Sequence, residues 1–196
     1  MSKTGIIILA AGSSSRLGQP KQLLQFKGES LLQHTIMQAL NVPDAAVAVV
    51  TGAANEAVTE DISQFHVNVF YNPYWEQGMG SSIAAGLKNL LLIHPEITHC
   101  IITVCDQPQV TDTVFLALIA AQQNTGKGIV ASWYSDTAGV PALFAQKYFE
   151  ELLGLSGNEG AKKFFNKYTD DSTTVPFKDG ATDIDTVDDY NELINE

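Results

Sequence analysis

Basic residues are scarce in this sequence. Its 196 residues include 11 lysines and arginines against 22 acidic residues, which gives a formal net charge of −11. Proteins that bind nucleic acid present a basic patch to its phosphates, so we expect no nucleic-acid partner. The sequence also lacks an apolar run of the roughly 20 residues that a membrane-spanning helix needs, so we expect no membrane partner.

Cysteine is nearly absent as well. Cys100 and Cys105 fall in one predicted strand at an odd separation, which directs their side chains to opposite faces and excludes a disulfide between them. Neither has a second cysteine or a histidine at metal-ligand spacing. Residues 1–5 lead directly into the first apolar run and leave no room for a signal peptide. We therefore expect buried thiols and a cytoplasmic protein.

Apolar runs of strand length alternate with segments of helical periodicity along the chain. Such alternation predicts right-handed crossovers and a three-layer α/β/α sandwich on a mostly parallel sheet. No linker or repeat divides the sequence, so we expect one domain over 1–196. The expected strands are 5–10, 46–51, 67–71, 100–105, 128–133, 139–144 and 172–177, and the expected helices are 31–40 after a Ser30 N-cap, 53–65, 81–93 capped by Ser81 or Ser82, 112–123, 147–155, 159–168 and 187–194.

The stretch 9–21 joins the first predicted strand to a glycine-rich turn. Gly12 and Gly18 permit backbone conformations that other residues avoid, and small neighbours let backbone N–H groups approach an anion. Arg16, the only arginine in the sequence, lies in this turn, and its planar guanidinium suits phosphate. Pro20 disfavours helical backbone at Gln19, the residue before it, so we expect the adjacent Lys21 on an extended loop. The residues alone fit both an anion cradle and an ordinary strand-to-helix connection.

Two widespread phosphate motifs do not fit this stretch. A P-loop needs Gly-Lys followed by Ser or Thr, and the dinucleotide fingerprint needs three glycines at fixed positions. The stretch instead resembles the signature of the MobA-like nucleotidyltransferases. The matching residues are Leu9, Ala10, Ala11, Gly12, Arg16, Leu17, Gly18 and Lys21.

Three later segments lie at the ends of predicted strands or before predicted helices. Residues 72–82 carry two glycines and two serines ahead of a helix and could bring a helix N-terminus to a ligand. Asp106 follows a buried strand within Cys-Asp-Gln-Pro, where a hard-cation ligand would lie. Asp185 belongs to Asp-Ile-Asp-Thr before the last helix, where acidic residues also favour the helix dipole.

The resemblance implies roles for these residues and a Rossmann-like fold of the nucleotide-diphospho-sugar transferase type. It implies that Arg16 and Lys21 neutralise an NTP triphosphate in the Leu9–Gly12 loop and act with Asp106 in catalysis. It also implies that Asp106 and Asp185 hold Mg²⁺, or Mn²⁺ in its place. The segment Gly80, Ser81 and Ser82 is implied to contact the base and ribose.

Within the family the sequence is most similar to the molybdenum cofactor cytidylyltransferase group. This implies transfer of CMP from CTP to molybdopterin with release of pyrophosphate, and Ala11 favours CTP over GTP. The N-terminal half would bind NTP and the C-terminal half the acceptor, through Gly139-Val140-Pro141 and 157–162, where Asn158 replaces the usual Asp. Two alternatives remain: transfer from GTP or CTP to another small phosphorylated acceptor, and a non-catalytic carrier that inserts molybdenum cofactor into a hydroxylase partner.

Overall fold

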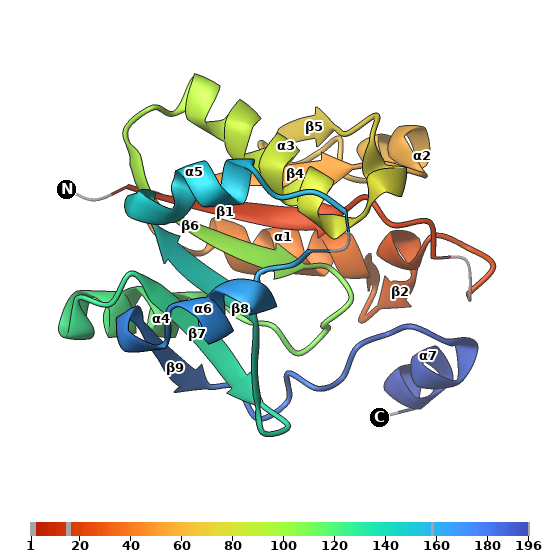
Figure 1. Cartoon of the computed structure of the whole chain (residues 1–196). Coiled ribbons are helices and arrows are strands. Elements are labelled where there is room, and N and C mark those ends of the chain that lie inside the picture. The colour runs from red at the N-terminus through yellow and green to blue at the C-terminus, as the bar shows by residue number, and fades with distance from the viewer. Residues whose placement is uncertain (1–2, 15–16, 158, 196) are drawn as a thin grey trace.

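A seven-stranded sheet, ordered β5-β4-β1-β6-β8-β7-β9, forms the centre of the molecule, and strands β2 and β3 make a separate two-stranded ribbon (Figure 1). These features come from a computed structural model that describes residues 3–14, 17–157 and 159–195. The strands are β1 (Lys3–Ala10), β2 (Gln25–Phe26), β3 (Glu29–Ser30), β4 (Ala46–Thr51), β5 (Asn68–Tyr71), β6 (Ile97–Val104), β7 (Ile129–Tyr134), β8 (Thr137–Ala145) and β9 (Ser172–Pro176).

Helices cover both faces of this sheet and bury two separate apolar cores. One core draws on α3, α5 and α6, and the other on α1, α2 and α4. The three-layer α/β/α prediction is thereby confirmed. The helices are α1 (Leu31–Leu40), α2 (Asn55–Asp61), α3 (Met79–Ile93), α4 (Asp112–Thr125), α5 (Phe149–Leu153), α6 (Lys162–Lys167) and α7 (Val187–Ile194). Within the described ranges, no helix is long and apolar enough to cross a membrane.

The two cysteines lie on opposite faces of the sheet, as their spacing predicts. Cys100 belongs to the core under α3, and Cys105 belongs to the core under α1 and α4. Both thiols are free and buried. Burial, together with the nearby charge of Asp106, raises the pKa of Cys105 to about 12, so the thiol stays protonated.

The sheet is mostly parallel, but β8 runs antiparallel to both of its neighbours. A two-residue turn, Ser135 and Asp136, joins β7 to β8, and both residues have positive φ values of 47° and 56°. Such a turn matches the twist of a hairpin but is usually built from glycine or asparagine, so Ser135 and Asp136 do not predict it. The hairpin places β7 parallel to β9 at the sheet edge.

Several helix boundaries differ from the sequence-based prediction. Ser81 and Ser82 do not cap α3, which begins at Met79 after Gly78, a residue with φ of 103°. The helix expected over 53–65 is confined to α2. The Ser30 prediction is correct, because Ser30 caps α1 in a reciprocal capping box with the side chain of Gln33.

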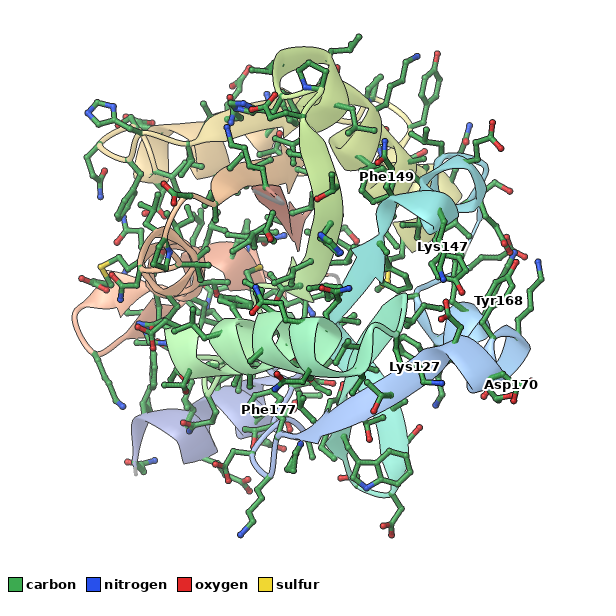
Figure 2. The ribbon with its side chains drawn as sticks, turned by 90° about the vertical axis from the view of Figure 1, so that its left-hand side faces the viewer. Lys127, Lys147, Phe149, Tyr168, Asp170 and Phe177 are labelled. Carbon is green, nitrogen blue, oxygen red and sulfur yellow. The ribbon has the colours of Figure 1, made fainter. Side chains whose placement is uncertain are left out.

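The side of the molecule formed by α5, α6 and the start of β9 carries several ion pairs. Figure 2 shows Lys127, Lys147, Tyr168 and Asp170 gathered there. The ammonium of Lys127 donates to the backbone oxygen of Asp170 at 2.5 Å, and Lys147 pairs with Asp171 at 2.7 Å. Because Lys127 precedes β7, it lies at the amino ends of the parallel strands.

Gly86 lets α3 pack directly on the sheet. A Cβ atom at this position would lie 2.6 Å from Val50 Cγ2 and 2.8 Å from Ile7 Cγ2, both fully buried. Gly86→Ala should therefore lower the free energy of unfolding by about 1–3 kcal/mol through overpacking, although alanine is the better helix former. Urea unfolding measures this change. A Gly86→Ala protein as stable as the parent would contradict the packing, and Ala85→Gly controls for helix propensity alone.

Candidate active site

The carboxyl ends of β1, β4 and β6 bring the glycine-rich loop beside the Cys-Asp-Gln-Pro turn. Leu9 pairs with Val104 in parallel register, so the loop after β1 and Asp106 leave the sheet at the same edge. Ala10 pairs with Thr51 on the other side of β1. Ligand sites of open parallel sheets form at this edge.

The glycine-rich loop is shaped by Ser14 and Gly18. Both have positive φ values, 52° and 69°, and the Ser14 backbone oxygen accepts a hydrogen bond from Leu17 N at 3.0 Å. Gly12 has no positive φ value, so its backbone does not use the conformational freedom that a glycine permits. A Cβ atom on Gly12 would meet nothing within 4 Å, and the space beside this residue is open to a ligand.

Lys21 begins a single 3-10 turn, Lys21–Leu23, and the expectation of an extended loop is wrong at this residue. Pro20 is itself extended, at φ −60° and ψ 115°, and acts as the N-cap of the turn. The Lys21 backbone N–H donates to Ser14 Oγ at 3.0 Å. A proline before a turn restricts only the residue that precedes it, so the turn can begin directly afterwards.

Gln22 fastens this turn to the glycine-rich loop. Its side-chain amide donates to the backbone oxygens of Ala10 and Gly12, both at 2.9 Å, and the residue is only 1% exposed. Both bonds come from a single buried amide, so they tie the turn to the backbone on either side of Ala11. Gln22 therefore holds Lys21 at a fixed position relative to the loop.

Lys21, Asp106 and Asp185 form an ion cluster at the centre of this edge. The Lys21 ammonium contacts Asp106 Oδ2 and lies 3.1 Å from Asp185 Oδ1. The Lys21 and Asp106 side chains are 18% and 15% exposed. Burial alone would lower the pKa of Lys21, but the charges of Asp106 and Asp185 outweigh it and raise the pKa to about 12. The ammonium is therefore charged at neutral pH.

Asp185 is fixed by the cap of α7 and by a link to the Asp106 turn. Asp189 Oδ2 accepts from the backbone N–H groups of Asp185 and Thr186, at 3.0 and 2.7 Å, in a capping box. Ile184 N donates to the Asp106 backbone oxygen at 3.0 Å, and the Ile184 side chain is fully buried. These contacts bring together two carboxylates that lie far apart in sequence.

Gln107 also links the Asp106 turn to the segment that precedes Asp185. Its amide donates to Gly180 O at 2.8 Å and to Tyr134 Oη at 3.3 Å, and the residue is 1% exposed. Burial raises the pKa of Tyr134, so its phenol stays neutral. The Cys-Asp-Gln-Pro motif predicts a role for its aspartate but none for Gln107.

Asp183 adds a third carboxylate near the ion cluster. The side chain is exposed, but the surrounding chain limits its hydration, and this, with the negative charge of Asp106, raises its pKa to about 6. Asp183 belongs to the Asp-Ile-Asp-Thr motif, but the motif alone predicts no role for this residue. The only signal for it was its position two residues before Asp185.

The opposite wall of the site is the turn from Asn72 into α3. Asn72 is buried, and its amide donates to Ser81 Oγ at 2.9 Å and Ser82 Oγ at 3.0 Å. Ser81 Oγ donates to Gly78 O at 2.8 Å. The two serines therefore brace this wall through Asn72.

Between these walls lies a cavity of about 380 Å³. A larger hollow of about 670 Å³ lies at the other edge of the sheet, around Lys3 and Glu96, but it contains none of the motif residues. We therefore assign the candidate site to the smaller cavity. Its lining residues are Leu9, Ala11, Gly12, Ser13, Lys21, Trp75, Glu76, Gly78, Met79, Ser82, Val104 and Asp106.

Not every predicted site residue lines this cavity. Ala10 is buried behind the loop, and Gly80 packs against the backbone of Ser156, where a Cβ atom would lie 2.8 Å from its oxygen. Ser81 braces the wall from outside the lining, and Asp185 approaches the cavity through Lys21. Two predictions, Arg16 and Asn158, fall outside the described residues.

The order of these motifs along the chain corresponds to a known family. Residues 6–172 match the MobA-like NTP transferase domain. The chain belongs to this family. The matched segment covers the sheet as far as the start of β9, the glycine-rich loop and the Asp106 turn, while Asp185 and α7 lie beyond it.

Individual relatives agree with this assignment and with a nucleotidyltransferase enzyme. The chain is 24% identical over 190 residues to molybdenum cofactor cytidylyltransferase of Escherichia coli (strain K12), covering 97% of this chain and 95% of the relative. It is 26% identical over 195 residues to purine catabolism protein PucB of Bacillus subtilis (strain 168), covering 94% and 93%. Rv0371c of Mycobacterium tuberculosis H37Rv, solved in complex with manganese, is 26% identical with a TM-score of 0.79 and full coverage of both chains.

Replacing Gln107 by methionine should destabilise the protein without creating a large cavity. Gly180 O would lose its donor, and an unsatisfied buried carbonyl costs about 1–3 kcal/mol of unfolding free energy. Gln109→Met, on the same turn but with its side chain partly exposed, is the matched control and should change stability little. Equal unfolding midpoints in urea for the two variants would contradict the proposed link.

Proposed function

We propose that this MobA-like protein is a Mg²⁺-dependent nucleotidyltransferase that transfers CMP from CTP to a phosphorylated acceptor of the molybdopterin type and releases pyrophosphate. The observation that carries the proposal is the cluster of Lys21, Asp106 and Asp185 beside a cavity lined by the glycine-rich loop. Phosphoryl chemistry of this kind requires mainly positioning and neutralisation of charge.

The carboxylates suit a divalent cation. Asp106 Oδ1 is buried and accepts no hydrogen bond from the described residues, and Oδ2 already faces a cation, the Lys21 ammonium. The described residues contain no cluster of three or more histidine, cysteine or acidic ligands placed for a metal. Mg²⁺ commonly takes one or two carboxylates and completes its shell with water and phosphate oxygens. Asp106 and Asp185 would therefore hold Mg²⁺ or Mn²⁺, and the manganese complex of Rv0371c supports a divalent ion.

The chain would act on the triphosphate through charge and backbone. A bound divalent ion would act as a Lewis acid on phosphate oxygens. Lys21 lines the cavity beside Gly12 and Ser13, where its ammonium can reach a triphosphate and stabilise the charge on departing pyrophosphate. Arg16 is proposed for the same task from its position in the motif.

The nucleotide side of the site belongs to the first half of the chain. Every residue that lines the cavity lies between Leu9 and Asp106, which supports a single domain with its NTP side N-terminal and its acceptor side C-terminal. Gly52 has no room for a side chain, since a Cβ atom would lie 2.4 Å from Ala11 O and 2.8 Å from Trp75 Cβ. Gly52 therefore packs directly against Ala11 and Trp75, two residues that line the cavity. CTP, with its smaller pyrimidine base, is our proposal for the nucleotide, and the similarity to a cytidylyltransferase supports it.

The acceptor would approach from the C-terminal half. Gly80 N donates to Gly157 O at 3.0 Å, so Gly157 lies against the cavity wall. The terminal phosphate of the acceptor would attack the α-phosphorus of CTP in line, breaking the bond to pyrophosphate. Another phosphorylated acceptor, and a non-catalytic cofactor carrier, are the alternatives to be tested.

Pyrophosphate release with each of the four NTPs, with and without molybdopterin, tests the function. We expect release with CTP only when acceptor and Mg²⁺ are both present. Silence with every NTP, together with tight cofactor binding, would favour the carrier. Transfer that does not need molybdopterin-type acceptors would contradict the proposed substrate.

Asp106→Asn should reduce pyrophosphate release by roughly 100-fold or more, because it removes a charge that holds the metal. Thermal unfolding checks that the fold is kept. Asp136→Asn, an exposed aspartate on the β7–β8 turn, should retain parental turnover. An Asp106→Asn enzyme with the parental rate would refute the metal assignment.

A further inference from the structure

The site proposed to bind a metal already contains a cation of the protein itself. The Lys21 ammonium contacts Asp106 Oδ2 and Asp185 Oδ1, one oxygen from each carboxylate proposed to hold the divalent ion. A metal that binds both aspartates must therefore either displace this ammonium or lie close beside it. Two cations at a few ångströms repel each other strongly where water is partly excluded.

Lys21 is anchored at its backbone, whereas its ammonium is held only by the carboxylates of Asp106 and Asp185 among the described residues. The backbone N–H is held by Ser14 Oγ, and the following residue, Gln22, is buried and bonded to the glycine-rich loop. The four-carbon stem ends in a compact charge that can rotate about its base. Lys21 also lines the cavity with Gly12 and Ser13, so a short movement carries the ammonium from the carboxylates to the nucleotide space.

We propose that Lys21 makes this site select a metal–nucleotide complex over the free metal ion. The inference rests on the proposed function, because it requires a triphosphate in the cavity. A free divalent ion that displaces the ammonium provides no new anion with which the ammonium can pair. A metal–triphosphate complex brings that anion, so the ammonium can leave Asp106 and Asp185 for phosphate as the metal arrives. Lys21 is therefore a specificity-determining residue as well as a phosphate ligand.

The test is a titration of the protein with Mn²⁺ in the absence of turnover. Binding is measured by calorimetry and by the electron paramagnetic resonance signal of free Mn²⁺. In the absence of nucleotide, Lys21→Met should bind Mn²⁺ with a Kd at least about tenfold lower than the parent, since a competing charge is removed. Lys21→Arg keeps the charge and should bind Mn²⁺ as weakly as the parent. Lys127→Met, at the other edge of the sheet, is the matched lysine control and should leave the Kd unchanged.

A second titration adds α,β-methylene CTP, or the GTP analogue if GTP proves to be the substrate. The analogue should lower the Kd of the parent for Mn²⁺. In Lys21→Met the analogue should lower this Kd less, and the difference should equal the factor by which the substitution tightens Mn²⁺ binding without nucleotide. The double variant Lys21→Met/Asp106→Asn should lose the gain, which would locate the added affinity at this site. If Lys21→Met does not fold, as judged by circular dichroism, Lys21→Gln replaces it with the same expectation.

Unchanged or weaker Mn²⁺ binding by a folded, uncharged Lys21 variant would overturn the inference. So would a gain that survives Asp106→Asn. These results do not depend on pyrophosphate release. Absence of release with every NTP would remove the proposed reaction alone, whereas normal release with unchanged Mn²⁺ affinity would remove the inference alone.

Discussion

The structure of the site depends on the charge balance between one ammonium and two carboxylates. Without Lys21, Asp106 and Asp185 would place two negative charges side by side in a partly dehydrated pocket. The surrounding chain is built around this arrangement: β1 and β6 align the two loops, Gln22 fixes the lysine, and the α7 cap fixes the second aspartate. A cation at this position, whether it belongs to the chain or to a ligand, therefore relieves the repulsion between the two carboxylates.

The sequence predicts the architecture well because its signals are local and repeated. Buried apolar runs defined the main strands, and the Ser30 cap and the periodicity of 31–40 located α1. Non-local features were less visible. The strands of the β2–β3 ribbon are only two residues long each. The turn from β7 into β8 places Ser135 and Asp136 at positive φ, a conformation that these residue types rarely adopt. Antiparallel insertion of β8 depends on that turn and on partners far along the chain.

The candidate site shows the same division between local and non-local information. Motifs identified Lys21, Asp106 and Asp185, but their mutual contact could not be read from spacing because it arises from strand register and from the α7 cap. The roles of Gln22 and Gln107 could not be predicted, because the function of a buried glutamine becomes visible only when the carbonyl groups around it are known. The assumption that glycine shapes the loop was half correct: Gly18 does so, whereas Ser14 takes the second left-handed position.

The link between Ile184 and the Asp106 turn has a consequence for how the protein matures. Lys21 and Asp185 are 164 positions apart, and Lys21 and Asp106 are 85 apart, so this cluster is among the longest loop closures in the fold. Contacts of such separation lose the most chain entropy on formation and depend on a sheet that is already in place. During synthesis, the glycine-rich loop and the Asp106 turn leave the ribosome well before the second aspartate. A nascent chain can therefore hold most of its sheet and still lack a competent centre, and activity reports on completed folding rather than on the presence of the nucleotide loop.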